Sequence, residues 1–270
     1  MSKRIVLLST GSPVAQAMAQ RMASIQADLT LIVREDAPRS FRYSALSELA
    51  RHLIGHRLMN AIGVMKLPAK ARRTVRTEQR LQRKADELFR DRLFKTGGSF
   101  GWPRGVEIFN TPEINNEATI ARVREARPDL LVVFGTKLLK PPLIASSVLG
   151  AVNAHSSLLP AYRGLRSEFW QCYHNDPTSV GLTIHVVEPG VDVGDILFTR
   201  STPTEWPTDP FLLRALNILA ALEHFPGVVE DHLNGLTRPQ PQGRSDQPTY
   251  RGKDITMEKR IELMERLAGG

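Results

Sequence analysis

The fold is decided by the stretch RIVLLSTGSP at residues 4–13. Its first six residues, with the apolar run 5–8 at their centre, are typical of a buried parallel strand, and Thr10-Gly11-Ser12-Pro13 makes a turn. Apolar residues then recur at helical spacing over 14–25, and 29–33 is a second short run of apolar, mostly β-branched residues. Strand, glycine turn, helix and strand in this order predict a doubly wound α/β fold with a mostly parallel sheet. The turn lacks a complete G-x-G-x-x-G, which argues against a dinucleotide site.

The alternation of predicted strands and helices continues later in the chain. Five further apolar runs predict strands, at 106–109, 130–134, 151–155, 180–187 and 196–199. Helical spacing predicts three helices, at 112–126 with Thr111 as the N-cap, at 212–222 and at 257–267. We expect residues 1–205 to form one α/β domain and 206–270 to form a helical extension packed on the same domain.

Residues 39–98 interrupt this alternation. Helical spacing at 44–59 and 74–93, with Pro68 between them, predicts a helical insertion or an enlarged crossover. From Arg39 to Lys95 there are 15 Lys and Arg against 5 Asp and Glu, a local net charge of +10 in a chain whose total is +8. Either a solvated surface or a docking surface for an anionic substrate or nucleic acid accounts for this charge.

Composition excludes several classes of protein. The chain has 270 residues, 41% of them hydrophobic, and Cys172 is its one cysteine, so an intrachain disulfide and a cysteine-built zinc site are excluded. The apolar run after Met1 is too short for a signal peptide, and no membrane-spanning helix is predicted. We therefore expect a cytoplasmic protein.

The chemistry is concentrated in the segment 153–164, NAHSSLLPAYRG. Asn153 and His155 are two residues apart at the end of a predicted strand, so their side chains point to the same side. An amide and an imidazole beside a rigid loop can stabilise an oxyanion and move a proton, which is what acyl transfer requires. Tyr162 and Arg163 bring further hydrogen-bond donors to this loop.

A carboxylate completes the predicted site. The acidic turn EPGVDVGD at 188–195 lies between two predicted strands and holds Asp192 and Asp195. Asp192 can pair with His155 and raise the pKa of that imidazole. Asp195 is interpreted as a loop carboxylate, and His185, inside an apolar run, as a structural residue.

These residues resemble the signature of the folate-dependent formyltransferases. The family includes glycinamide ribonucleotide formyltransferase, methionyl-tRNA formyltransferase and the amino-sugar N-formyltransferases. Asn153-x-His155 with the following loop to Gly164, and Gly190-Val191-Asp192-Val193-Gly194, are similar to its two site motifs, and 128–135 resembles its central strand. The resemblance implies a Rossmann-like fold with a catalytic domain at 1–205.

The resemblance also implies a mechanism. An acceptor amine attacks the formyl group of 10-formyltetrahydrofolate, Asn153 and His155 stabilise the oxyanion, and Asp192 assists proton transfer, with no metal. The residues expected to bind the folate are Lys137, Leu138, Leu139, Glu188, Val191 and Asp192. The residues expected to bind the acceptor are Gly11, Ser12, Ser157, Tyr162 and Arg163.

The sequence indicates the identity of the acceptor less clearly than that of the formyl donor. The residues of the loop motif and the predicted helices at the end of the chain resemble those of the amino-sugar N-formyltransferases. A nucleotide-linked amino sugar is therefore the favoured acceptor. Glycinamide ribonucleotide and a siderophore-type hydroxylamine remain as alternatives. The 69 residues after Ser201 do not predict a tRNA-binding β-barrel, so nucleic acid is disfavoured, and a homodimer is left open. An alternative of another class is a non-catalytic folate-binding or RNA-binding protein.

Overall fold

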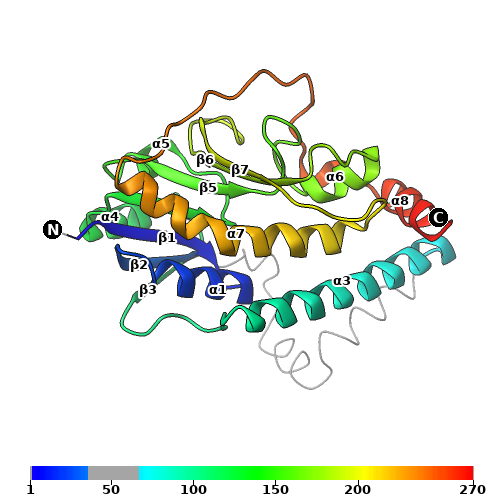
Figure 1. Ribbon diagram of the computed structural model, residues 1–270, viewed down its shortest axis with the longest axis horizontal. Coiled ribbons are helices and arrows are strands. Elements are labelled where there is room, and N and C mark those ends of the chain that lie inside the picture. The colour runs from blue at the N-terminus through cyan, green and yellow to red at the C-terminus, as the bar shows by residue number, and fades with distance from the viewer. Residues whose placement is uncertain (1, 36–66, 270) are drawn as a thin grey trace.

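The computed structural model of the chain describes residues 2–35 and 67–269. These residues form a seven-stranded sheet in the order β3-β2-β1-β4-β5-β6-β7 (Figure 1). β1 to β5 are parallel, and β6 and β7 are antiparallel to their neighbours, which confirms the predicted fold class. The strands are β1 (Arg4–Thr10), β2 (Asp28–Glu35), β3 (Glu107–Thr111), β4 (Leu130–Phe134), β5 (Ala151–His155), β6 (Gly181–Val186) and β7 (Ile196–Ser201).

Helices cover both faces of this sheet. α1 (Pro13–Met22), α3 (Ala69–Lys95) and α7 (Pro210–Leu233) contribute to the core on one face. α4 (Glu117–Ala126) and α5 (Pro141–Ile144) cover the other face. α6 (Ser167–His174) and α8 (Met257–Gly269) enclose a third, aromatic core near the C-terminus, and η1 (Gly252–Asp254) is a short 3-10 helix (Figure 1).

The apolar run of β1 is explained by burial on both sides. Ile5 and Leu7 belong to the core on the α1 face, and Val6 and Leu8 belong to the core on the α4 face. All four side chains are fully buried. Each burial is worth about 1.5–3 kcal/mol, so this strand anchors both layers.

α4 begins later than its sequence predicts. Thr111 is the last residue of β3, where it pairs with Glu35, and it is therefore not a helix cap. Asn116 caps the helix instead, because its side-chain oxygen accepts a hydrogen bond from Thr119 N at 2.7 Å. The predicted start at Pro112 is wrong, and the predicted helix at 44–59 lies outside the described residues.

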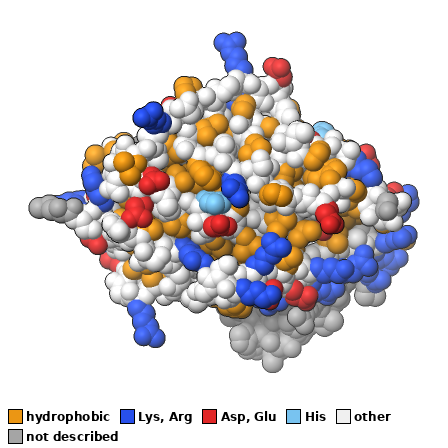
Figure 2. Space-filling model, viewed as in Figure 1, with side chains coloured by type: hydrophobic (Ala, Val, Ile, Leu, Met, Phe, Trp, Pro, Cys, Tyr) orange, Lys and Arg blue, Asp and Glu red, His pale blue; other side chains and the backbone are white. Residues whose placement is uncertain are grey.

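α3 lies on the connection between the parallel neighbours β2 and β3, so the described part of the basic segment is an enlarged crossover. Its buried side chains include Ala85, Phe89 and Leu93 of the core, and it packs against α7 and α8. Lys and Arg side chains gather at the right of the face in Figure 2, over α3 and α8.

α7 is, by length and composition alone, apolar enough to cross a membrane, although no such segment was expected from the sequence. Half of its apolar window is buried, and it packs against α1, α3 and the strands β5 to β7. Leu222, Phe225 and Val229 are core residues. Packing inside the fold therefore accounts for its composition. The domain boundary near residue 205 stays a prediction.

The order of the strands creates a ligand-binding edge. The chain passes from β1 to β2 on one side, whereas β4 pairs with β1 on the other side. The carboxyl ends of β1 and β4 meet where the winding direction changes, and Ser9 Oγ donates a 2.6 Å hydrogen bond to Phe134 O there. Open α/β sheets bind ligands at this kind of position.

Candidate active site

A cleft of about 1100 Å³ opens at this edge of the sheet. The ends of β1, β2, β4 and β5 reach it, together with the loop before β7 and the first turns of α6 and α7. Its lining includes Thr10, Ser12, Glu35 and residues 133–139, 153–156, 164–168 and 190–192. The cleft therefore brings the predicted folate-binding and catalytic segments together.

His155 and Asp192 meet inside this cleft. His155 Nδ1 lies 3.4 Å from Asp192 Oδ2, and His155 Nε2 lies 3.0 Å from the Tyr162 carbonyl oxygen. A carboxylate and a carbonyl both accept hydrogen bonds, so the ring lies between two acceptors and can donate from both nitrogens. These two contacts fix the orientation of the His155 ring in the cleft.

Asp192 is held by three donors. Gly164 N donates to its Oδ2 at 2.8 Å, and its Oδ1 lies 3.5 Å from His185 Nε2. Burial alone would raise the pKa of Asp192, but the charge of His155 and the hydrogen bonds from His185 and Gly164 lower it to about 2. The carboxylate is therefore ionised at neutral pH.

The loop that carries Asp192 is tightly constrained. Asp192 itself has a φ of 51°, a left-handed conformation that is uncommon outside glycine. A Cβ at Gly194 would lie 1.9 Å from Val186 O, so only glycine fits there. Gln242 Nε2 donates to the carbonyl oxygens of Asp192 and Gly194, at 3.0 and 2.6 Å. The C-terminal part of the chain thus fixes the loop.

His185 lies beside the predicted catalytic residues Asn153 and Asp192, whereas the sequence predicts a structural role for it. It pairs with Asn153 in the antiparallel register of β5 and β6, and its Nε2 lies 3.2 Å from Asn153 Nδ2. Its Nδ1 donates to Val186 O at 2.8 Å, which fixes the orientation of the ring. The antiparallel pairing, invisible in the sequence, was the signal that was missing.

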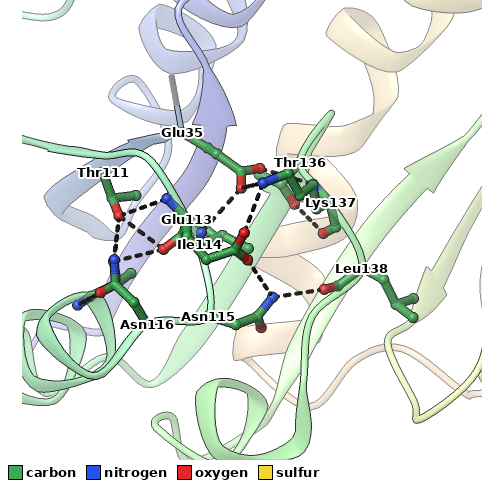
Figure 3. Close-up of polar contacts among 10 residues, drawn as sticks. Glu35, Thr111, Glu113, Ile114, Asn115, Asn116, Thr136, Lys137 and Leu138 are labelled. Atoms are coloured by element: carbon green, nitrogen blue, oxygen red, sulfur yellow. Dashed lines mark hydrogen bonds and ion pairs between the residues drawn. The ribbon is translucent and has the colours of Figure 1, made fainter. Parts of the chain in front are cut away.

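The predicted folate-binding segment is fixed by a second polar network (Figure 3). Glu35, at the end of β2 and only 4% exposed, accepts from Ile114 N and Lys137 N, both at 3.1 Å. Lys137 Nζ lies 2.9 Å from Glu113 Oε2 and 3.1 Å from Glu35 Oε1. The hydrogen bond to Glu113 is the main cause that raises the pKa of Lys137, followed by that to Glu35.

Two leucines of this segment differ in exposure. Leu138 is 55% exposed in the cleft wall, and Asn115 Nδ2 donates to its carbonyl oxygen at 3.0 Å (Figure 3). Leu139 is buried in the core on the α4 face. Glu188 and Val191 also line the cleft. These positions are compatible with the expected folate contacts, which stay predictions.

Several predicted acceptor residues do not reach the cleft. Ser157 is fully buried and donates to Ala161 O, and Tyr162 is 2% exposed with its hydroxyl donating to Asp176 Oδ2 at 3.0 Å. Both side chains form hydrogen bonds within the protein, and the expected contacts of these residues with the acceptor stay a prediction. Gly11 and Arg163 are not part of the lining either, whereas Ser12 is.

Ser12 serves two purposes at the end of β1. Its hydroxyl accepts a hydrogen bond from Ala15 N at 3.2 Å and so caps α1. It also lines the cleft, so a ligand can reach the first turn of this helix. Within residues 2–35 and 67–269, no group of three or more His, Cys, Asp or Glu could hold a metal ion.

Comparison with known proteins agrees with this geometry. The profile of the family described as "Formyl transferase" matches residues 3–209. A methionyl-tRNA formyltransferase of Pelobacter propionicus is 32% identical over 142 residues, which cover 52% of this chain and 44% of that protein. The chain therefore spans less than half the length of this curated relative.

Solved structures share the fold. A glycinamide ribonucleotide transformylase 1 from Symbiobacterium toebii has a TM-score of 0.56 at 18% identity, with 88% of this chain and 94% of that chain covered. A sugar 3N-formyl transferase solved with dTDP and 5-N-formyl-THF has a TM-score of 0.57 at 13% identity, with 97% and 78% covered. The family match over most of its length shows that the chain belongs to the formyl transferase family.

Proposed function

We propose that this protein transfers a formyl group from 10-formyltetrahydrofolate to the amine of a small-molecule acceptor, with a nucleotide-linked amino sugar as the favoured acceptor. The observation that carries the proposal is the cluster of Asn153, His155 and Asp192 in one cleft at the edge of the sheet. The family match supports formyl transfer as the reaction.

The geometry supports a direct transfer. The nitrogen lone pair of the acceptor adds to the formyl carbon, and the carbonyl electrons move to oxygen in a tetrahedral intermediate. An N–H of Asn153 and the imidazole of His155 stabilise this oxyanion. The intermediate then collapses as the bond to N10 of the folate breaks. Asp192, held ionised, accepts a proton from the acceptor nitrogen, directly or through water, and the same proton is then passed to N10, which restores the carboxylate.

The donor is proposed to bind along residues 135–139. The backbone of this segment is fixed by Glu35 and Asn115, so its remaining polar groups and Leu138 present a preformed surface to the cleft. The sugar 3N-formyl transferase that shares the fold was solved with 5-N-formyl-THF, which supports a folate donor.

Three exposed arginines in the cleft wall support an anionic acceptor. Arg166, Arg214 and Arg251 line the cleft, all three are exposed, and none forms an ion pair within the described residues. Guanidinium groups bind phosphates well because they offer several N–H donors in one plane. A phosphorylated or nucleotide-linked amine fits this lining, and glycinamide ribonucleotide shares the required chemistry.

An RNA acceptor is the second candidate. The curated relative described above is a methionyl-tRNA formyltransferase, and α3 exposes basic side chains near the cleft, whose lining includes Gln82 and Asp86 of this helix. Binding to RNA would depend steeply on salt, because each phosphate contact releases counterions.

A formyl-transfer assay tests the proposal. Purified protein is incubated with 10-formyltetrahydrofolate and, separately, with dTDP-linked 3-amino and 4-amino sugars, glycinamide ribonucleotide, a hydroxylamine and methionyl-tRNA. We expect turnover with a nucleotide-linked amino sugar and a loss of about 10²–10⁴-fold in His155→Ala and Asp192→Asn. Unchanged rates in both variants would refute the mechanism, and turnover of methionyl-tRNA alone would select the second candidate.

A further inference from the structure

Glu168 is a buried carboxylate without a partner. It lies in the first turn of α6 and is only 3% exposed. Within residues 2–35 and 67–269, its carboxylate makes no hydrogen bond and no ion pair. The residue nevertheless lines the cleft. The roles proposed for Asn153, His155 and Asp192 do not explain why this carboxylate is buried.

Such a group is costly unless something binds it. An ionised carboxylate loses its hydration when it is buried, and the loss is repaid only by hydrogen bonds or by a positive charge. The oxygens of Glu168 are not among the sealed, unpartnered polar atoms of the described residues, so they keep contact with solvent, which reaches them through the cleft. The hydrogen-bond donors that the carboxylate lacks can therefore come from a ligand in the cleft.

Glu168 is also close to the reacting groups. The preceding residue, Ser167, places its hydroxyl 3.3 Å from His155 Nε2, and both residues line the cleft. Arg166, on the other side of Ser167, has a φ of 62°, an uncommon left-handed conformation for a non-glycine residue. The turn from 166 to 168 thus presents a cation, a hydroxyl and a buried carboxylate to the cleft, beside the proposed oxyanion site.

We propose that Glu168 binds the acceptor by accepting hydrogen bonds from hydroxyl groups next to the amine that is formylated. This inference rests on the proposed function and narrows the acceptor to a hydroxylated amine, such as an amino sugar. A carboxylate can accept from two neighbouring hydroxyls at once, because its two oxygens lie in one plane. The arginines on the cleft wall then bind the anionic part of the same molecule. Glu168 selects the acceptor and is not involved in binding the folate.

The variant Glu168→Gln separates this role from a structural one. It keeps the shape of the side chain and removes the charge that the hydroxyls would bind. With the dTDP-linked amino sugar as the probe, we expect the acceptor KM to rise about tenfold to a hundredfold, with kcat much less affected. A rise of this size corresponds to the loss of one charge-assisted hydrogen bond. The Kd for 5-formyltetrahydrofolate, measured by calorimetry, is expected to stay unchanged. Glu168→Asp should restore part of the acceptor affinity.

Stability gives a second readout. Because the free protein leaves this carboxylate unpaired, Glu168→Gln is expected to have an unchanged or higher Tm. Glu205→Gln is the matched control, since Glu205 is exposed in a loop and does not line the cleft. It should change neither KM nor Tm.

The outcomes distinguish the two proposals. If wild type turns over an acceptor and Glu168→Gln leaves its acceptor KM unchanged, the role of Glu168 is overturned while the proposed function stands. A lower Tm together with weaker binding of 5-formyltetrahydrofolate would likewise overturn it, because Glu168 would then be structural. If wild type binds 5-formyltetrahydrofolate but formylates none of the acceptors, the proposed function fails and this inference fails with it.

Discussion

Asp192→Asn should make the fold less sensitive to acid. In the wild type, the side chain of Asp192 is 15% exposed and accepts from Gly164 N, while its oxygens lie 3.4 Å from His155 and 3.5 Å from His185. The asparagine keeps the size of this side chain and can still accept from Gly164. It removes the charge that the two imidazoles attract, so the comparison isolates one electrostatic contribution.

The expected magnitude follows from the pKa of Asp192. Burial works to raise this pKa, but His155, His185 and Gly164 N lower it from 3.8 to about 2. Since a tenfold change in acidity is worth about 1.4 kcal/mol, ionised Asp192 stabilises the fold by about 2 kcal/mol. The folded-state pKa is below the unfolded-state value, so this stabilisation is present above about pH 4 and is lost as the pH falls towards about 2.

Urea unfolding at about pH 6 and at about pH 2 measures this effect. The wild type should be more stable than Asp192→Asn by about 2 kcal/mol at the higher pH, and the difference should nearly vanish at the lower pH. Asp195→Asn, in the same loop, is the control for removing a carboxylate. If the difference between wild type and Asp192→Asn did not change with pH, the ionised pair would not exist and the reasoning would be wrong.

Three further predictions concern the loops around the cleft. Gly164→Ala should lower the free energy of unfolding, measured in urea, by more than about 2 kcal/mol, because φ of Gly164 is 100° and a Cβ there would lie 2.1 Å from Tyr250 O. Gly243→Ala is the control, because the space around Gly243 is open. Gln242→Ala should lower kcat about tenfold, because it removes two hydrogen bonds that fix the loop carrying Asp192. An unchanged kcat in steady-state assays would show that Gln242 is not needed to position this loop. Lys137→Met should raise the donor KM about tenfold with little change in the acceptor KM, and equal effects on both would contradict the assignment of this segment to the donor.

Local sequence patterns were sufficient to predict most of the strands and the main residues of the candidate site. A continuous apolar run such as 4–9 predicts a strand buried on both faces, because only a sheet covered by helices on both sides buries every residue of such a run. Asn153, His155 and Asp192 could also be singled out, because polar side chains at strand ends and a glycine-bounded acidic loop are not needed for packing. The helix start at Pro112 was wrong because strand pairing took Thr111 into β3.

The sequence by itself therefore determined the fold class, the family motifs and the chemical groups that are proposed to carry out the reaction. Only the tertiary structure decided which of them face the cleft. His185 reaches Asp192 through the antiparallel pairing of β6, and Tyr162 turns into an aromatic core. Glu168 is buried and has no hydrogen-bond or ion-pair partner within the part of the chain that the structure describes. Each outcome depends on contacts between segments far apart in the chain. The direction and burial of a side chain follow from those neighbours, whereas its residue type and spacing are visible in the sequence.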